Sequence, residues 1–524
     1  MLNKEVMDGL SIFLSKKRIN QINFRKINTE KDIFSSIFEN ISSNREKYAQ
    51  FYTHKELVTF ILNNINFSKN NKVLDPACGA GAFLIELLNR GINPDNLYGI
   101  DIDKTALEMC KFNAKTNNNI ILRNLINKNT LNGLDLMGGF DLIIGNPPFK
   151  NLKRDNIEYD LFNPLFEKVT SNSVNSATLM IVKSWELLNE EGYLGFVLPK
   201  NLIRVESFSK LRKFILDNFL IKMVVDLDHH FKDVRGDQII LILQKNKSEE
   251  FRSKNKVKII PYKKGLTFGE SEGYYINQID FEKYPFFPLF YNLKIKELSD
   301  KLIKVDTKLS DFSKGIFRGI SIGSNHKAVS KARSKDSLIC YRGDSIKRFG
   351  IKYPLYLNYS ELTSSDINKL NRLKLDKIII QNICSKEGGI FATISNKEEV
   401  SLDTVTNIIL NDNNYMRYIA SVLNSKLSNF FMIFVVYLNS NFTMHTDKSY
   451  IGGIPIVKPT EKQLKKLNEI FDRINSIEDK YSKEFFEEYH QLNNLIYRIY
   501  NLSEQDIFVI EQSLKEVMSK RQNG

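Results

Sequence analysis

A glycine-rich turn between an apolar strand and a helix constrains the fold of this chain more than any other feature. Residues 72–75 predict a short strand, Gly79 and Gly81 follow it, and residues 83–89 predict a helix. Glycine permits a tight bend and lets a ligand approach the backbone closely. A second predicted strand ends at Asp101, about 20 residues further on, which is the spacing at which doubly wound sheets bind ribose hydroxyls. The turn and the carboxylate together predict a nucleoside-binding parallel sheet.

Strands and helices alternate through residues 72–244, and this alternation predicts a mostly parallel sheet with helices on both faces. Ligands of such sheets bind outside the carboxyl ends of the strands. The glycine turn, Asp101, a loop containing Asn129 and a turn at Asn146 all fall at predicted strand ends. They are therefore expected to form one composite site.

The turn at residues 146–149 follows a buried strand and has the sequence Asn-Pro-Pro-Phe. Pro147 and Pro148 have fixed φ angles and no backbone N–H, and Pro147 also keeps Asn146 out of the helical region. The rigid turn therefore presents an amide side chain and a free carbonyl as two acceptors for an exocyclic amino group. The ring of Phe149 is placed to lie against the same planar substrate.

Helices are predicted within residues 1–65, and the first 45 residues are too few for a separate enzymatic domain. Thr53 and Glu56 are three residues apart and precede apolar residues at helical spacing. This pattern predicts a capping box that opens an amphipathic helix.

The formal net charge of +14 and the pI near 9.2 favour a polyanionic partner, either nucleic acid or an acidic membrane surface. The longest apolar run, residues 430–438, is far shorter than the roughly 20 residues of a membrane helix. The four cysteines form no CxxC pair. No cluster of side chains has metal-ligand spacing, so no metal is expected. We expect a soluble, cytoplasmic protein.

Composition changes at residues 245–264, where lysine, serine and asparagine replace apolar residues. We predict a first domain at 1–265, with a sheet core at 66–250, a linker at 266–288 and a second domain at 289–524 that ends in helices from 460. Basic loops interleaved with aromatic residues in the second domain suit contact with phosphates and bases; a solvated basic face is the alternative. The candidate DNA-binding residues are Arg318, Lys327, Arg342, Lys347 and Arg348.

Four motifs, taken in order, resemble those of a known family. They are FYTHKE at 51–56, DPACGAGAF at 75–83, GIDID at 99–103 and NPPF at 146–149. Their order is similar to that of the gamma-class, TaqI-like N6-adenine DNA methyltransferases with a C-terminal target-recognition domain. Segments such as LNSKLSNFF and IGGIPIVKP resemble, more loosely, recognition domains of Eco57I-like and type I specificity proteins. The resemblance implies a Rossmann-like S-adenosylmethionine-dependent domain with a mostly parallel seven-stranded sheet, and a mixed α+β recognition domain with C-terminal helices.

The resemblance also implies roles for single residues. Asn146 and the Pro147 carbonyl would bind the adenine N6 amino group, with Pro148 in the same catalytic turn. Phe149 would stack on the flipped base and Phe231 would cover its other face. Asn129 stands where the family usually has aspartate, and Phe149 where it more often has tyrosine. The residues that would contact the cofactor are Thr53, Asp75, Ala77, Gly79, Gly81, Asp101 and Asn129.

The implied reaction is direct methyl transfer from S-adenosylmethionine to an adenine that has been flipped out of double-stranded DNA, within a restriction–modification or other DNA-modification system. Two alternatives remain: an NPPF-type enzyme acting on RNA or protein, and a DNA-specificity subunit with an inactive methylase fold. A separate restriction endonuclease remains a candidate partner, and a monomer is favoured. The recognised DNA sequence does not follow from the residues alone, because base reading depends on loop geometry.

Overall fold

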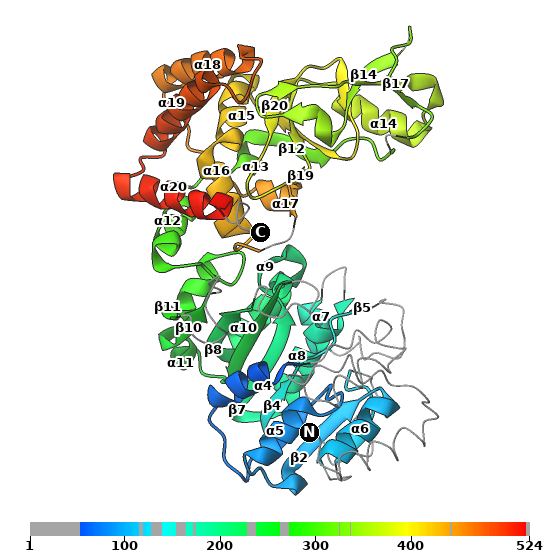
Figure 1. Cartoon of the computed structure of the whole chain (residues 1–524), viewed down its shortest axis with the longest axis vertical. Helices are drawn as coiled ribbons and strands as arrows, with labels where there is room; N and C mark the ends of the chain where they lie inside the picture. Colours follow the sequence, from blue (N-terminus) through cyan, green and yellow to red (C-terminus); the bar gives the residue numbers. More distant parts are fainter. Residues whose placement is uncertain are drawn as a thin grey trace. The chain divides into compact units, whose positions relative to one another are not determined.

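The computed structural model describes residues 53–114, 119–126, 139–152, 164–170, 174–227, 237–261, 272–323, 325–335, 337–440 and 443–519. The chain divides into two compact units, Met1–Leu289 and Phe290–Gly524 (Figure 1). Each unit is described by itself.

A nine-stranded sheet forms the centre of the first unit, with the strand order β11-β10-β8-β9-β7-β4-β1-β2-β3. Its strands are β1 (Val73–Asp75), β2 (Leu97–Asp101), β3 (Ile120–Leu122), β4 (Phe140–Gly145), β7 (Leu188–Pro199), β8 (Phe219–Asp226), β9 (Gln238–Lys245), β10 (Lys256–Ile260) and β11 (Tyr274–Asn277). Strand β9 runs antiparallel to β7 and β8, and β11 runs antiparallel to β10, while the other pairs are parallel. The predicted mostly parallel sheet is confirmed, with two strands more than the expected seven.

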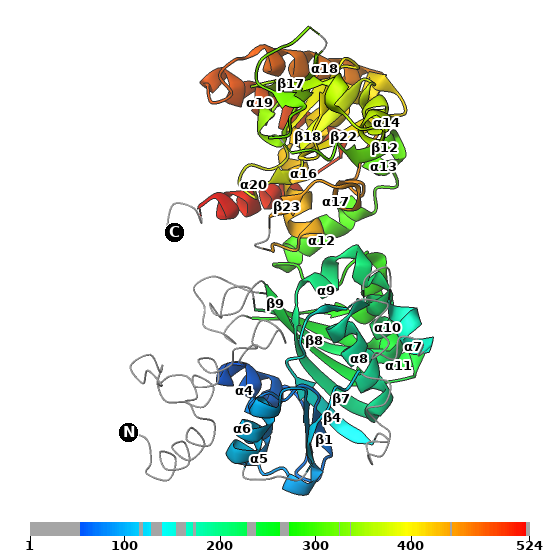
Figure 2. The ribbon, with the colours of Figure 1, turned by 90° about the vertical axis from the view of Figure 1, so that its right-hand side faces the viewer.

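Helices cover both faces of this sheet (Figure 2). One layer contains α4 (Lys55–Asn63), α5 (Ala82–Asn89) and α6 (Lys104–Ala114), and the other contains α7 (Pro164–Val169), α8 (Ser176–Leu187) and α10 (Ser209–Asn218). Apolar residues of α4, α5 and α6 pack in one buried cluster with residues of the sheet, among them Ile61, Leu84, Leu107, Val73 and Ile144. Short elements α9 (Asn201–Arg204), α11 (Glu249–Lys254), β5 (Asn151–Leu152) and β6 (Val174–Asn175) complete the described part of the unit.

The described part of the segment predicted as a linker is not a linker. Strand β11 pairs with β10, so that Val257 faces Ile276. The Gln278 side chain is buried, its Oε1 accepts from the Ile221 N–H at 2.8 Å and its Nε2 donates to the Phe219 carbonyl at 2.8 Å. The polar residues around 245–264 suggest an exposed connection, but the alternating apolar residues of β10 are sufficient for a strand, which pairs between β8 and the edge strand β11.

The second unit contains two four-stranded sheets. The first has the order β12-β22-β18-β20 and is antiparallel, and the second has the order β13-β17-β14-β21. Their strands are β12 (Ser313–Arg318), β22 (Val405–Leu410), β18 (Lys377–Gln381), β20 (Ala392–Ser395), β13 (Val329–Ser330), β17 (Leu355–Asn358), β14 (Ser337–Tyr341) and β21 (Glu399–Ser401). Two further ribbons pair β15 (Ile346–Lys347) with β16 (Gly350–Ile351) and β19 (Ile383–Cys384) with β23 (Met444–His445).

Helices accompany these sheets and end the chain, which confirms the predicted mixed domain with C-terminal helices. They are α12 (Leu293–Ile303), α13 (Leu309–Phe312), α14 (Ser364–Leu373), α15 (Met416–Asn424), α16 (Lys426–Phe430), α17 (Lys448–Ile451), α18 (Glu461–Ser476), α19 (Lys483–Ile499) and α20 (Glu504–Ser519). In the described ranges no single helix is long and apolar enough to cross a membrane. The bent pair Asn413–Asn424 and Lys426–Val436 is long and apolar enough by length and composition alone, and most of its residues are buried.

Candidate active site

The carboxyl ends of β1, β2 and β4 bring Asp75, Asp101 and Asn146 to one edge of the sheet. Asp75 ends β1, Asp101 ends β2 and Asn146 directly follows β4, and the three strands are parallel neighbours. Gly145 lies so close to Asp75 that a Cβ at position 145 would stand 2.7 Å from Asp75 Oδ1. Of the composite site expected from the sequence, these residues therefore lie at one edge of the sheet.

The glycine turn is tied to the end of β2 by hydrogen bonds. The Gly79 N–H donates to Asp101 Oδ2 at 2.8 Å, and the Asp103 N–H donates to Asp101 Oδ1 at 2.8 Å. Gly79 has φ +52° and Gly81 has φ +94°, a region that L side chains avoid. The space beside Gly79 where a Cβ would stand is open, whereas a Cβ on Gly81 would lie 2.8 Å from the Cys110 sulfur. One glycine thus opens the turn to a ligand, and the other lets it pack on α6.

Two buried carboxylates lie beside this turn. Burial raises the pKa of Asp75 well above its ordinary value, and the nearby Asp101 raises it further, against a hydrogen bond from the Ala77 N–H that lowers it. Burial also raises the pKa of Asp101, although the N–H groups of Asp103 and Gly79 oppose this effect. Such carboxylates are stabilised by a ligand that supplies hydroxyl or amino hydrogens or a positive charge. The site therefore suits a cationic ligand with several such donors.

The Asn146 amide is oriented by Thr53. Asn146 Nδ2 donates to Thr53 Oγ1 at 3.2 Å, which leaves the Asn146 Oδ1 atom as an acceptor for a substrate. The capping box predicted for Thr53 is wrong: α4 begins after His54, and no side chain caps it. The position of the Thr53 hydroxyl near a helix start predicts a local cap, but its partner in the fold is Asn146, 93 residues away. Thr53 is thus part of the site through Asn146.

Further contacts hold the turn that contains the two prolines. Ser176, the first residue of α8, donates from its hydroxyl to the Pro148 carbonyl and accepts from the Lys150 N–H at 2.9 Å. Phe149 is half-buried and its ring centroid is 5.8 Å from that of Phe208, at 43° between ring planes. Among the described residues none donates a hydrogen bond to the Pro147 carbonyl. Sequence reasoning missed Ser176 and Phe208, because neither belongs to a motif.

A buried ion pair at the same edge was also missed. Lys200 follows the end of β7 and Asp226 ends β8; Lys200 Nζ lies 2.7 Å from Asp226 Oδ2, with 1% and 9% of the two side chains exposed. Lys200 directly follows a proline that ends a strand, which marks it in the sequence as a candidate site residue. No short-range pattern, however, pairs it with Asp226, which is 26 positions away. Asn129 and Phe231 lie outside the described residues. Among the residues that the structure does describe, no group of three or more side chains is placed to hold a metal ion.

Comparison with known proteins agrees with this arrangement. Residues 29–283 match the model of the N-6 DNA methylase family, and residues 338–456 match that of the TaqI-like C-terminal specificity domain. The chain thus contains an N-6 DNA methylase domain followed by a TaqI-like C-terminal specificity domain. The family predicted from the motifs is thereby confirmed, and with it the enzyme class, an adenine-N6 DNA methyltransferase of the restriction–modification type.

Individual relatives resemble the chain at low sequence identity. The chain is 27% identical to the type II methyltransferase M.VspI of Vibrio sp. (strain 343), over 60% of this chain and 75% of the relative. It is 25% identical to the type II restriction enzyme and methyltransferase RM.Eco57I of Escherichia coli, over 56% of this chain and 36% of that relative. Among solved structures, the type IIL restriction-modification enzyme MmeI has a TM-score of 0.64 at 14% identity, covering 94% of this chain and 82% of that chain. That likeness shows a shared fold across both units.

The predicted DNA-binding residues of the methylase have different surroundings in the second unit. Arg318, Lys327 and Arg342 are accessible and form ion pairs with carboxylates, and Lys347 is half-buried on β15. Arg348 instead donates to the carbonyls of Asn424 and Gly388 and to the Tyr489 hydroxyl, and its guanidinium lies 5.2 Å from the centre of the Phe391 ring. The contacts of Arg348 favour a structural role, so we remove it from the candidate DNA-binding set.

Proposed function

We propose that this methylase transfers a methyl group from S-adenosylmethionine to N6 of an adenine flipped out of double-stranded DNA, at a sequence read by its second unit. The observation that carries this proposal is the Asn146 amide, held by Thr53 at the sheet edge that also holds the glycine turn and Asp101. An amino-group acceptor and a nucleoside-binding turn share one edge, as a methyl transfer between two nucleosides requires.

The residues present fit the proposed cofactor. The open space beside Gly79 admits a ligand next to the backbone, and Asp101 can accept hydrogen bonds from ribose hydroxyls. Asp75, buried beside the turn, suits the amino or sulfonium charge of the ligand. When bound, S-adenosylmethionine supplies an electrophilic methyl group on a sulfonium. Asn129 and Ala77 stay candidates for its adenine and methionine parts.

The turn at Asn146 prepares the substrate amino group. Asn146 Oδ1 and the Pro147 carbonyl can accept its two hydrogens, which draws the nitrogen toward a tetrahedral geometry and localises its lone pair. The Phe149 ring, with Phe208 behind it, offers a face on which the base stacks. No strong base is needed to begin the reaction, because alignment of the two reactants supplies much of the acceleration.

The adenine inside a duplex cannot reach this edge, so it must be extruded at a cost of a few kcal/mol. We assign the compensating DNA contacts to the accessible cations Arg318, Lys327 and Arg342 of the second unit and to the half-buried Lys347. Phe231, the second aromatic expected to cover the flipped base, remains part of the proposal. A restriction–modification role fits the family, and a separate nuclease partner belongs to the same proposal.

Replacing Asn146 tests this function. Asn146→Ala should abolish incorporation of tritiated methyl groups into bacterial genomic DNA while leaving S-adenosylmethionine and DNA binding close to those of the wild type. Thr53→Val, which removes the hydroxyl that orients the amide, should slow methylation about 5- to 10-fold, the equivalent of one ordinary hydrogen bond. Thr53→Ser keeps the hydroxyl and is the matched control. Near-normal methylation by Asn146→Ala would contradict the assigned role.

A specificity subunit without activity predicts a different result. That protein would bind DNA with normal affinity, show no binding of S-adenosylmethionine in a calorimetric titration, and methylate no DNA. The same set of measurements therefore separates the two functions.

A further inference from the structure

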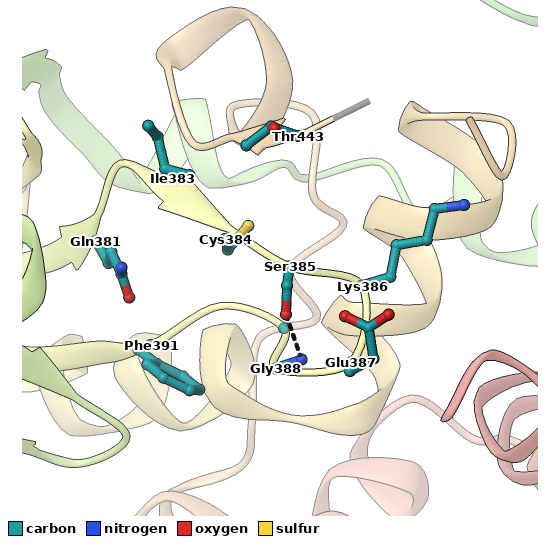
Figure 3. A pocket seen from close by; sticks show the side chains of 10 residues that line it. Gln381, Ile383, Cys384, Ser385, Lys386, Glu387, Gly388, Phe391 and Thr443 are labelled. Atoms are coloured by element: carbon teal, nitrogen blue, oxygen red, sulfur yellow. Dashed lines mark hydrogen bonds between the residues drawn. The ribbon is translucent and has the colours of Figure 1, made fainter. Parts of the chain in front are cut away.

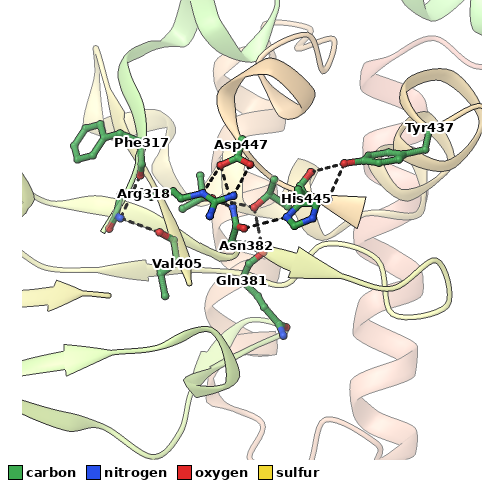
Figure 4. Close-up of polar contacts among 11 residues, drawn as sticks. Phe317, Arg318, Gln381, Asn382, Val405, Tyr437, His445 and Asp447 are labelled. Atoms are coloured by element: carbon green, nitrogen blue, oxygen red, sulfur yellow. Dashed lines mark hydrogen bonds and ion pairs between the residues drawn. The ribbon is translucent and has the colours of Figure 1, made fainter. Parts of the chain in front are cut away.

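A network of polar side chains joins three separate segments of the second unit (Figure 4). Arg318 ends β12, Asn382 follows β18, and Asp447 precedes α17. Arg318 donates from Nε to Asp447 Oδ1 at 2.6 Å and from Nη2 to Asp447 Oδ2 at 2.7 Å. Asn382 Nδ2 donates to the same Asp447 Oδ1 at 3.2 Å.

A hydrogen bond from a buried side chain of the second unit fixes the position of the Asp447 carboxylate. Asn382 is almost fully buried; its Nδ2 also donates to Thr406 Oγ1 at 3.0 Å, and its Oδ1 lies 3.3 Å from His445 Nδ1. Thr446 donates from its backbone N–H to the Asn382 carbonyl at 2.9 Å. Asp447 stands where a side chain commonly caps a helix, yet it makes no cap to α17. Its carboxylate oxygens accept from Arg318 and Asn382 instead.

This arrangement leaves one edge of the Arg318 guanidinium open. Of its five N–H groups, those at Nε and one at Nη2 are used by Asp447, which leaves two at Nη1 and one at Nη2. The side chain is 45% exposed. An Nη1–Nη2 edge matches the two acceptors, O6 and N7, that guanine presents in the major groove.

The carboxylate partner makes phosphate binding the weaker explanation for Arg318. Phosphate contacts draw their strength from net positive charge and the release of counterions. The Arg318–Asp447 pair is neutral as a unit, so it offers oriented donors and little net charge. Arg318 also differs from Lys327, which is paired with Glu361 at 2.6 Å and 75% exposed, because an ammonium has no planar fork of donors to present to a base edge.

A narrow ribbon continues the surface on which Arg318 lies. Ile383 of β19 faces His445 of β23, and the Ile383 side chain is 49% exposed. A cavity of about 530 Å³ borders this ribbon, and Gln381, Ile383 and Thr443 line it (Figure 3). The Gln381 carbonyl accepts from Thr446 Oγ1 at 3.1 Å, which links the cavity to the network. A two-stranded ribbon fits the major groove, and an exposed apolar side chain suits the thymine methyl group.

We propose that Arg318 reads a guanine of the recognised DNA sequence through its Nη1–Nη2 edge, and that Asp447 is the positioning residue that directs it. This inference rests on the proposed function, because it concerns the sequence at which this enzyme methylates adenine. It changes the role first predicted for Arg318, from general DNA contact to base recognition.

The test compares methylation motifs. Wild-type enzyme and variants are incubated with S-adenosylmethionine and unmethylated genomic DNA, and N6-methyladenine is mapped by single-molecule sequencing. Arg318→Ala should lower the preference for guanine at one motif position about 5- to 150-fold, the range of one bidentate base contact. Arg318→Lys keeps the charge but loses the planar fork, so it should lose the same preference. Asp447→Asn, of equal size, should lower the preference partly.

Lys327→Ala is the matched control. Because Lys327 is an accessible cation of the same unit, its loss should slow methylation by a similar factor at every sequence and leave the motif unchanged. Circular dichroism melting of each variant checks that it is folded, and Arg318→Lys and Asp447→Asn preserve side-chain volume should Arg318→Ala prove unstable.

The possible failures are distinct. Base reading by Arg318 would be refuted if the wild-type motif contained no guanine. It would also be refuted if Arg318→Ala and Arg318→Lys slowed methylation at every sequence and left the motif unchanged. Either result would leave the methyltransferase function intact. No N6-methyladenine from the wild-type enzyme on any DNA would overturn the proposed function, and this inference with it.

Discussion

The Lys200–Asp226 pair makes the stability of the catalytic unit sensitive to a single charge. Lys200 Nζ and Asp226 Oδ2 are 2.7 Å apart, and both side chains are buried at the carboxyl edge of the sheet. At an effective dielectric constant of 20, two unit charges at this separation attract by about 6 kcal/mol. The cost of removing both charges from water offsets much of that attraction.

Lys200→Met removes the ammonium and keeps a long apolar side chain. The Asp226 carboxylate then stays buried and loses the attraction of the Lys200 ammonium, a change that costs about 3–5 kcal/mol of unfolding free energy. The double variant Lys200→Met/Asp226→Leu should recover most of this loss, because an apolar pair of similar volume replaces the buried charges. Lys213→Met is the control: its partner Asp217 is 46% exposed and Lys213 is 65% exposed, so the loss should stay below about 1 kcal/mol.

Urea unfolding of the whole chain, followed by tryptophan fluorescence, measures these effects. The chain has a single tryptophan, Trp185, which lies in the first unit with Lys245 Nζ 4.8 Å from its ring centre. The signal therefore reports unfolding around the catalytic sheet and not of the second unit. An effect of Lys200→Met no larger than that of Lys213→Met, or a double variant as unstable as the sum of the single ones, would refute the reasoning.

Two further predictions concern the glycine turn and its carboxylate. Gly81→Ala should lower the free energy of unfolding more than Gly79→Ala, because the new Cβ at position 81 would lie 2.8 Å from the Cys110 sulfur. At position 79 the new Cβ enters open space, so Gly79→Ala should mainly weaken S-adenosylmethionine binding. Equal losses of stability in urea unfolding would contradict this. Burial raises the folded-state pKa of Asp101 above 3.8, so this group adds stability below its unfolded pKa and that contribution is lost as pH rises through the folded pKa. Cofactor affinity, which needs the carboxylate, should instead fall as pH drops toward the raised pKa, and Asp101→Asn should remove that part of the pH dependence in calorimetric titrations.

The candidate site residues that the structure brings together, as the sequence suggested, are those whose positions follow from strand ends. Asp75, Asp101 and Asn146 each end or follow an apolar strand, and a parallel sheet puts such ends at one edge whatever the loops between them do. The glycine turn was predictable for the same reason, since its conformation is local. The number of strands was not, because β10 and the edge strand β11 have short apolar patterns in a polar region.

Residues that act through a distant partner were beyond local reasoning. The Thr53 hydroxyl fitted a helix cap in sequence, but in the fold it accepts from Asn146. Phe208 stands behind Phe149 and has no motif of its own. In both cases the partner is fixed by the packing of elements that no short-range pattern relates.

Arg318 and Arg348 show why the charge of a recognition domain does not identify its DNA contacts. Both arginines stand in a basic, aromatic-rich stretch, and the sequence alone treats them alike. In the fold, Arg348 donates to groups from three other segments and helps join the strands to α19, while Arg318 keeps an open, directed edge. The difference comes from partners more than 100 positions away, Asp447 for one and Tyr489 for the other. Part of the net charge of +14 is therefore used inside the fold, and base recognition depends on which cations are aimed outward by a partner.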